Sequence, residues 1–205
     1  AMQRRHALQT LMVGASAIGA ATLLMGCKPK PISFEGVDIT GAQYGQDFPL
    51  PDAYGKPRSV SEFAGKVVVV FFGYTQCPDV CPTTLQELVE AKAILGEQGD
   101  RLQGIFVSLD PDRDTPEVLR AYAEAFDPQM VALTGSHEQI TAVAKDFKVF
   151  YKKVEGKQPG SYTLDHSAGL YVYDPQGKLR VYQRYGQGAQ ILAKDAKALL
   201  DEAKA

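Results

Sequence analysis

The chain has 205 residues, with 45% hydrophobic and 22% charged side chains and a formal net charge of −2. A chain of this length and composition usually forms one globular domain. The near balance of 22 basic and 24 acidic residues argues against a nucleic-acid partner and against a polybasic surface that binds membranes.

The first predicted element is a signal peptide of lipoprotein type over residues 1–26. Arg4 and Arg5 precede an uncharged stretch that ends in the letters LMGC, which is the layout of a secretory signal. A small residue before Cys27, with leucine three positions earlier, resembles a bacterial lipobox, so Cys27 is the predicted lipidation site. The alternative is an uncleaved anchor, because roughly 20 apolar residues span a bilayer. Both interpretations tether the protein outside the cytoplasm.

Residues 27–41 are predicted to be a linker and residues 42–205 the folded domain. The linker contains Pro and Gly and has no clear periodicity. Three prolines and one glycine interrupt residues 48–63, so we expect only short strands and turns there.

The rest of the domain alternates predicted strands and helices. The run VVVVFF at 67–72 is typical of a strand that is buried on both faces. Further strands are predicted at 102–109, 130–134, 149–154, 168–173 and 179–185, and helices at 83–95, from 115, from 136 and at 189–203.

Two of the helices have clear starting signals. Thr115 suits an N-cap and Pro116 the first helical position. Ser136 and Gln139 have capping-box spacing. The first of these helices is expected to bury a stripe that includes Val118.

The order β-α-β-α-β-α-β-β-β-α predicts an α/β fold. The turn at 174–177 joins the last two strands in a hairpin before the C-terminal helix. A cysteine pair follows the first buried strand at the mouth of a helix. This placement indicates a thioredoxin-like fold, with a central mixed sheet flanked by helices and an extra hairpin before the last helix.

The pair Cys77 and Cys81 is separated by three residues, whereas thioredoxin-type reductases have two between their cysteines. We expect Cys81 at the start of the helix, where free N–H groups stabilise a thiolate, and Cys77 on the preceding loop. Two close thiolates can cycle through a disulfide or hold a soft metal. A plain structural disulfide is the remaining interpretation, but closing so short a loop gains little chain entropy.

A metal on two thiolates needs a third ligand, for which imidazole is the commonest partner. The chain has three histidines. His6 lies in the signal, and His137 follows a helix N-cap and is predicted to be solvated. His166, which precedes a predicted strand, is therefore the candidate ligand.

Three segments resemble the signature of the Sco/SenC family. They are FFGYTQCPDVCP at 71–82, SLDPDRDTP at 108–116 and DHS at 165–167. The resemblance extends over roughly residues 48–200. It implies a thioredoxin-like protein that carries copper, as Cu(I) or Cu(II), to the dinuclear copper centre of cytochrome c oxidase.

By this resemblance the copper ligands fall on Cys77, Cys81 and His166. Asp165 is a candidate for a weak ligand or for the residue that orients the histidine. Asp110 and Asp114 match the acidic motif of the family, and helix capping and turn formation are the alternative roles for both.

The donor set suits Cu(I), which prefers soft ligands, and three protein ligands leave the metal open to an incoming thiolate. The implied partners are the copper-centre subunit of cytochrome c oxidase, a periplasmic copper donor and a thiol reductant, because only reduced thiols load copper. No nucleic acid is expected. The protein is predicted to face the periplasm or another extracytoplasmic space, anchored to the membrane by its N-terminal lipid.

Three other functions stay open. A thiol-disulfide oxidoreductase acting on an oxidase subunit would be an enzyme with Cys77 and Cys81 as its redox pair, and this role is compatible with copper carriage. A peroxiredoxin-type peroxidase fits poorly, because Thr75 is too close to Cys77 for a Thr-x-x-Cys pattern. Zinc is the competing metal, since two cysteines, one histidine and water are a known zinc arrangement.

Overall fold

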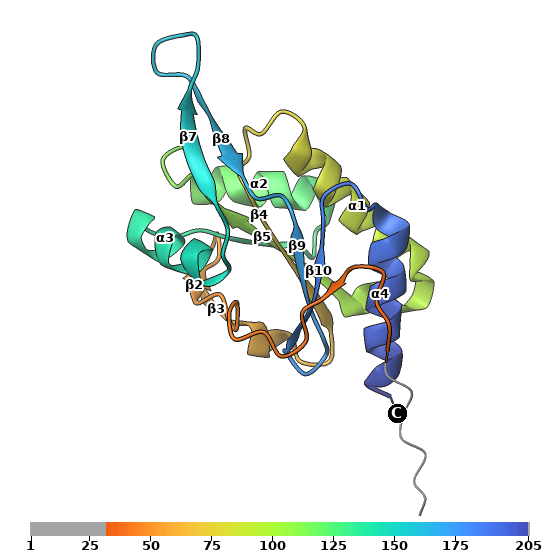
Figure 1. The fold of residues 1–205 in the computed structure, drawn as a ribbon. Helices are drawn as coiled ribbons and strands as arrows, with labels where there is room; N and C mark the ends of the chain where they lie inside the picture. Colours follow the sequence, from red (N-terminus) through yellow and green to blue (C-terminus); the bar gives the residue numbers. More distant parts are fainter. Residues whose placement is uncertain (1–31, 205) are drawn as a thin grey trace, which may run out of the picture. The chain divides into compact units, whose positions relative to one another are not determined.

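The computed structural model describes residues 32–204 (Figure 1). The predicted signal peptide and the predicted lipidation site at Cys27 lie outside the described residues. Among residues 32–204, none of the helices combines the length and the hydrophobicity that a membrane crossing requires.

A six-stranded mixed sheet forms the centre of the domain, in the order β1-β10-β9-β4-β5-β6. Its strands are β1 (Val37–Asp38), β4 (Val67–Gly73), β5 (Leu102–Ser108), β6 (Val131–Leu133), β9 (Leu170–Tyr173) and β10 (Leu179–Gln183). The pairs β4–β5 and β5–β6 are parallel, and the other pairs are antiparallel. All seven residues of β4 are buried, as the VVVVFF run predicts for a strand covered on both faces.

Four helices cover this sheet: α1 (Val80–Ile94), α2 (Pro116–Phe126), α3 (His137–Asp146) and α4 (Ala189–Glu202). Helix α1 packs against α4 and α2. Figure 1 shows α3 on the other side of the sheet from α1 and α4. The predicted α/β class, mixed sheet and final β9–β10 hairpin are confirmed.

Both predicted helix caps are present. Thr115 Oγ1 accepts the Val118 N–H at the start of α2, and Ser136 forms a capping box with Gln139 at the start of α3. The predicted burial of Val118 is wrong, because its side chain is 42% exposed. Leu119 forms the buried stripe instead, and Val118 lies about 100° round the helix from it.

A second hairpin, formed by β7 (Tyr151–Glu155) and β8 (Tyr162–His166), lies outside the six-stranded sheet. Figure 1 shows it projecting from the body of the domain. Strand β7 confirms the prediction at 149–154, but β8 has no counterpart among the predicted strands. Only Leu164 of β8 is buried, so the strand lacks the hydrophobic run or alternation that would reveal it.

The N-terminal edge of the fold includes part of the segment predicted as linker. Strand β1 pairs with β10, and the N–H groups of Glu35 and Gly36 donate to the Asp195 carboxylate at 2.8 Å each. Some residues of the segment predicted as linker therefore pack on the domain. The proline-interrupted segment forms only β2 (Leu50–Pro51), β3 (Pro57–Arg58) and the short helix η1 (Val60–Phe63), as expected; a second short helix, η2 (Gly96–Arg101), follows α1.

Candidate metal centre

The two cysteines lie where the β4 run passes into α1. Cys77 is on the connecting loop, where its N–H donates to the Tyr74 carbonyl at 3.2 Å, and Cys81 is the second residue of α1. The Cys81 N–H points at Cys77 Sγ over 3.4 Å. Both are free thiols, Cys77 9% exposed and Cys81 fully buried. The predicted positions of both residues are confirmed.

His166 ends β8 and faces the cysteines from the other side. Its Nε2 lies 3.5 Å from Cys81 Sγ, and its Nδ1 lies 2.9 Å from the Ser167 carbonyl oxygen. A carbonyl only accepts, so Nδ1 carries the proton and the Nε2 lone pair faces the sulfur. The rings of Phe71 and Tyr74 pack edge-on against the imidazole, with centroids 6.1 and 5.9 Å away.

The three predicted ligands converge. The two Sγ atoms and one imidazole nitrogen lie within 4.8 Å of one another. In the part of the chain that the structure describes, no other group of three cysteine, histidine or acidic side chains comes so close. Two sulfurs and one imidazole nitrogen form a donor set for a soft or borderline ion such as Cu(I) or Zn²⁺.

Asp165 and His137 stand apart from this group. Asp165 is exposed, and the hydrogen bond that orients the imidazole goes to the Ser167 carbonyl. His137 is exposed, and its Nε2 lies 2.9 Å from Asp112 Oδ1, which agrees with the prediction that it is a solvated first-turn residue. The Ser167 carbonyl could not be predicted, because a backbone acceptor leaves no trace in residue type.

A pocket of about 430 Å³ opens onto the site, lined by residues of the cysteine loop and of β8. Cys77 and His166 line it, whereas Cys81 lies beneath them. An ion held by the three residues would therefore be reached from solvent on the side of Cys77 and His166.

Burial shifts the pKa values of two of the three candidate ligands, Cys81 and His166. Burial, followed by the hydrogen bond with Cys77, raises the pKa of the Cys81 thiol far above its ordinary value. The expectation that the helix start stabilises a Cys81 thiolate is therefore wrong for the metal-free protein. Burial also lowers the pKa of His166, because it disfavours the imidazolium. At neutral pH the metal-free site therefore holds a neutral imidazole, ready to donate a lone pair, and a protonated Cys81.

Asp114 supports the cysteine loop from below. Its buried carboxylate accepts hydrogen bonds from the Thr75 N–H at 3.0 Å, the Thr75 hydroxyl at 2.6 Å and the Ser108 hydroxyl at 2.7 Å. These bonds tie the loop that carries Cys77 to the end of β5. Asp110 forms the neighbouring turn, since its carbonyl accepts the Asp114 N–H at 2.9 Å. Asp114 thus supports the site through its carboxylate, and Asp110 through its backbone carbonyl.

Gly73, which the sequence analysis did not single out, leaves the space for Cys81. A Cβ atom at Gly73 would lie 2.8 Å from Cys81 Sγ and 3.0 Å from the Phe106 ring. We expect Gly73→Ala to displace the sulfur, to lower stability by about 1–3 kcal/mol and to weaken metal binding.

Chemical denaturation and Cu(I) titration would test this. The matched control is Gly104→Ala on β5, where the added methyl meets the ends of two flexible side chains, Leu88 at 3.1 Å and Met130 at 3.4 Å. Equal effects of the two substitutions on metal affinity would contradict the role of Gly73.

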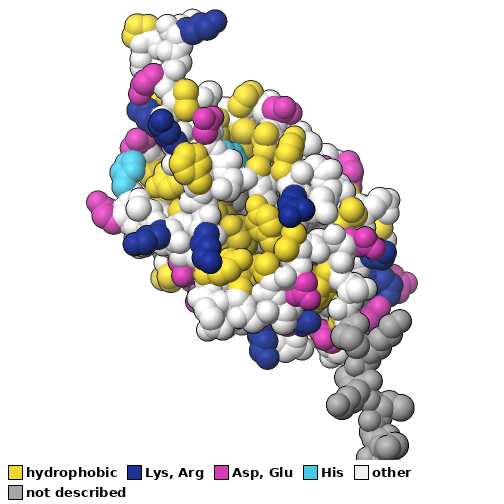
Figure 2. Space-filling model, in the orientation of Figure 1, with side chains coloured by type: hydrophobic (Ala, Val, Ile, Leu, Met, Phe, Trp, Pro, Cys, Tyr) yellow, Lys and Arg dark blue, Asp and Glu magenta, His cyan; other side chains and the backbone are white. Residues whose placement is uncertain are grey.

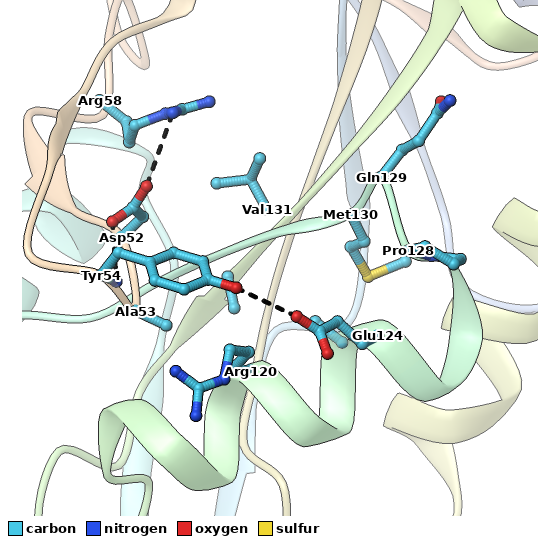
Figure 3. Close-up of a pocket in the computed structure, with 12 residues that line it drawn as sticks. Asp52, Ala53, Tyr54, Arg58, Arg120, Glu124, Pro128, Gln129, Met130 and Val131 are labelled. Carbon is cyan, nitrogen blue, oxygen red and sulfur yellow. Dashed lines mark hydrogen bonds and ion pairs between the residues drawn. The ribbon is translucent and has the colours of Figure 1, made fainter.

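A separate pocket of about 220 Å³ lies between α2, β6 and the β2–β3 turn (Figure 3). Tyr54 donates to Glu124 at 3.2 Å across it, and Arg58 pairs with Asp52 at 3.5 Å. Its lining contains neither cysteine nor histidine, and Met130 supplies the one sulfur atom among the lining residues.

The chain is similar to known proteins over most of its length. Residues 37–201 match the family model SCO1/SenC. A SCO2-like protein of Rickettsia felis is 36% identical over 173 residues, which are 82% of this chain and 83% of that protein.

Solved structures are similar as well. Apo Sco1 of Thermus thermophilus is 40% identical with a TM-score of 0.71, covering 82% of this chain and 97% of its own. ScoI of Bradyrhizobium japonicum with copper bound is 38% identical with a TM-score of 0.66, covering 74% and 96%. A SCO1/SenC family lipoprotein of Bacillus anthracis is 29% identical with a TM-score of 0.63, covering 75% and 92%.

Proposed function

The chain belongs to the SCO1/SenC family, and on this basis we propose that it is a copper carrier that supplies the dinuclear copper centre of cytochrome c oxidase. The copper is held by Cys77, Cys81 and His166. The observation that carries the proposal is the convergence of two sulfurs and one imidazole nitrogen within 4.8 Å. The similarity to a ScoI structure that contains copper supports copper as the ion.

The site suits a cargo ion that must leave again. Thiolate and imidazole ligands bind copper strongly, yet three ligands leave the ion open to a further thiolate from an acceptor. Because Cys77 and His166 line the pocket, an incoming ligand meets the ion on their side. Cys81 lies below, where it can retain the ion while the outer ligands exchange.

The surface around the opening suits a protein acceptor. Phe150 is 61% exposed, and its N–H donates to the Ser167 hydroxyl at 3.0 Å, next to His166. Figure 2 shows hydrophobic side chains gathered below the β7–β8 hairpin, with lysine and arginine side chains among them. Exposed apolar side chains with a charged rim are typical of protein–protein contact surfaces.

Copper binding is expected to release at least one proton. The raised pKa keeps the Cys81 thiol protonated in the metal-free protein, and the metal binds only the thiolate. The lowered pKa of His166 means that no proton competes at the imidazole above neutral pH. Cu(I) affinity should therefore rise about tenfold per pH unit for each proton released between roughly pH 6 and 8. Competition titrations at fixed pH values measure this slope, and a flat profile would contradict it.

The delivery proposal is tested by a transfer experiment. Protein loaded with Cu(I) is mixed with the reduced, metal-free copper-centre domain of a cytochrome c oxidase, and the two are separated and assayed for copper. We expect copper to move to the oxidase domain. Retention of all copper on the carrier, or transfer no faster than from a small-molecule Cu(I) complex, would refute the delivery role. A periplasmic copper donor and a thiol reductant complete the proposal.

A thiol-disulfide oxidoreductase is the second candidate, favoured by two free thiols, one on the loop before α1 and one at the start of α1, with sulfurs within 4.8 Å of each other. A substitution at His166 distinguishes the two functions. His166→Ala should weaken copper binding and leave any reduction of an oxidised oxidase domain unchanged, because the exchange uses only the cysteines.

Localisation forms a further part of the proposal: the domain is exported and held at the membrane by a lipid on Cys27. The similarity to a family lipoprotein of Bacillus anthracis supports it. Fatty-acid labelling of the wild type and of Cys27→Ser in a bacterial host tests it, with label and membrane retention expected only in the wild type.

A further inference from the structure

The position of His166 depends on a hairpin that no strand of the main sheet holds. Strands β7 and β8 pair only with each other. At the base, the Ser167 N–H donates to the Phe150 carbonyl at 2.9 Å, which closes the hairpin on itself. Contacts of another kind must therefore fix the distance between the imidazole and the cysteines.

Arg113 makes such contacts with both parts. Its Nη1 donates to the carbonyl oxygen of Tyr162, the first residue of β8, at 2.9 Å. The same nitrogen donates at 3.1 Å to the side-chain oxygen of Gln76, the residue before Cys77. One guanidinium thus joins the hairpin that carries the histidine to the loop that carries a cysteine.

Tyr162 is held a second time through its side chain. The guanidinium carbon lies 3.5 Å from the centroid of the Tyr162 ring, within the range of a cation–π contact. The Tyr162 hydroxyl donates to one oxygen of Asp110 at 2.7 Å, and Arg113 Nε donates to the other at 2.5 Å. Asp110 therefore fixes the arginine and the tyrosine in one arrangement.

The position of Arg113 is unfavourable for one of its own guanidinium nitrogens. The Arg113 side chain is 18% exposed, and within residues 32–204 its Nη2 is buried without a hydrogen-bond partner. An unpaired buried donor is unfavourable. The contacts of Arg113 with Gln76 and Tyr162 offset this unfavourable burial.

We infer that Arg113 is a positioning residue of the metal centre, which fastens β8 to the cysteine loop and thereby keeps His166 within bonding reach of both sulfurs. The inference rests on the ligand set of the proposed function. It assigns the arginine of the segment at 108–116 a role in assembling the site, without direct contact with the ion.

The first test uses the metal-free protein, so that it does not depend on copper. Arg113→Lys keeps the charge but loses the planar fork that reaches two acceptors and stacks on a ring. We expect amide hydrogen exchange in β8 to accelerate about tenfold, with β5 unchanged. The control is Arg120→Lys on α2, where the guanidinium lies 5.4 Å from the Tyr54 ring centroid at the remote pocket (Figure 3). Unchanged exchange in β8, or equal acceleration throughout the chain, would overturn the inference.

The second test is a double-mutant cycle on Cu(I) affinity. Arg113→Lys should weaken binding by about 10- to 100-fold, the usual effect of losing a group that orients a ligand. In a His166→Ala background the same substitution should cost little more, because the histidine that Arg113 positions is gone. A full additive loss in that background would overturn the role. Absence of copper binding in the wild type would instead refute the proposed function, and the exchange experiment would still decide the role of Arg113.

Discussion

Replacing Cys81 by serine is expected to abolish copper binding under conditions in which the wild type binds one ion per chain. The substitution keeps the shape of the side chain but replaces a soft thiolate by a hard hydroxyl that stays protonated. Loss of a group that only orients a ligand costs about 10- to 100-fold in affinity, so loss of a ligand atom should cost more than that. Cys77→Ser should act in the same way.

The measurement is competition for Cu(I) with a chromophoric chelator, together with the visible spectrum after Cu(II) addition. The wild type should show an intense sulfur-to-metal charge-transfer band, and either variant should lack it. Cys27→Ser is the matched control, since it makes the same chemical change at a cysteine that is not one of the proposed ligands. A Cys81→Ser protein that kept the band would exclude Cys81 as a ligand.

Replacing Asp114 by alanine is expected to destabilise the domain more than any other substitution considered, with the cysteine loop as the part most affected. It leaves three donors without an acceptor, namely the Thr75 N–H, the Thr75 hydroxyl and the buried Ser108 hydroxyl. An unsatisfied buried donor costs about 1–3 kcal/mol, so roughly 3 kcal/mol or more is expected. Thermal and chemical denaturation measure this, and Cu(I) titration of the remaining folded protein should show weakened binding. A loss below about 1 kcal/mol would show that the loop does not depend on this carboxylate.

Asp114 also predicts a pH dependence of stability. Burial, opposed by the hydrogen bonds from Thr75 and Ser108, raises its pKa above the ordinary value of 3.8. The folded state therefore holds this proton more tightly than the unfolded state. The contribution is fully present below the unfolded pKa and is lost as the pH rises through the folded pKa. The stability of the wild type relative to Asp114→Asn should fall over that window, and a difference that stays constant with pH would contradict the assignment.

The cysteine half of the site could be predicted because its determinants are local. A buried strand, a loop that carries Cys77 and a helix start that carries Cys81 follow one another within residues 67–82, so the two cysteines fall near each other in any fold of this order. Apart from β1, which falls in the predicted linker, the strands and helices of the main sheet are predictable for the same reason, since each has its own hydrophobic run, periodicity or capping signal. The burial of Val118 is predicted wrongly because a shift of one residue along the helix moves a side chain from the buried stripe to the exposed flank.

For the histidine half of the site, the sequence predicts which residue is the ligand but not the strand that positions it. His166 was identified by the need for a third ligand and by resemblance, whereas β8, which carries it, has only one buried residue and no readable pattern. The hydrogen bond from Arg113 to the Tyr162 carbonyl spans 49 positions in the chain, and no local sequence pattern around either residue predicts it. Long-range polar contacts of this kind depend on the finished fold, so the structure was needed to find them.

The central claim is that two sulfurs and one imidazole nitrogen bind a single copper ion, and X-ray absorption at the copper edge tests it most directly. Protein loaded with one equivalent of Cu(I) should show two sulfur neighbours and one nitrogen neighbour, and His166→Ala should lose the nitrogen while keeping both sulfurs. A spectrum of the wild type with fewer than two sulfurs, or one that His166→Ala leaves unchanged, would contradict this copper site.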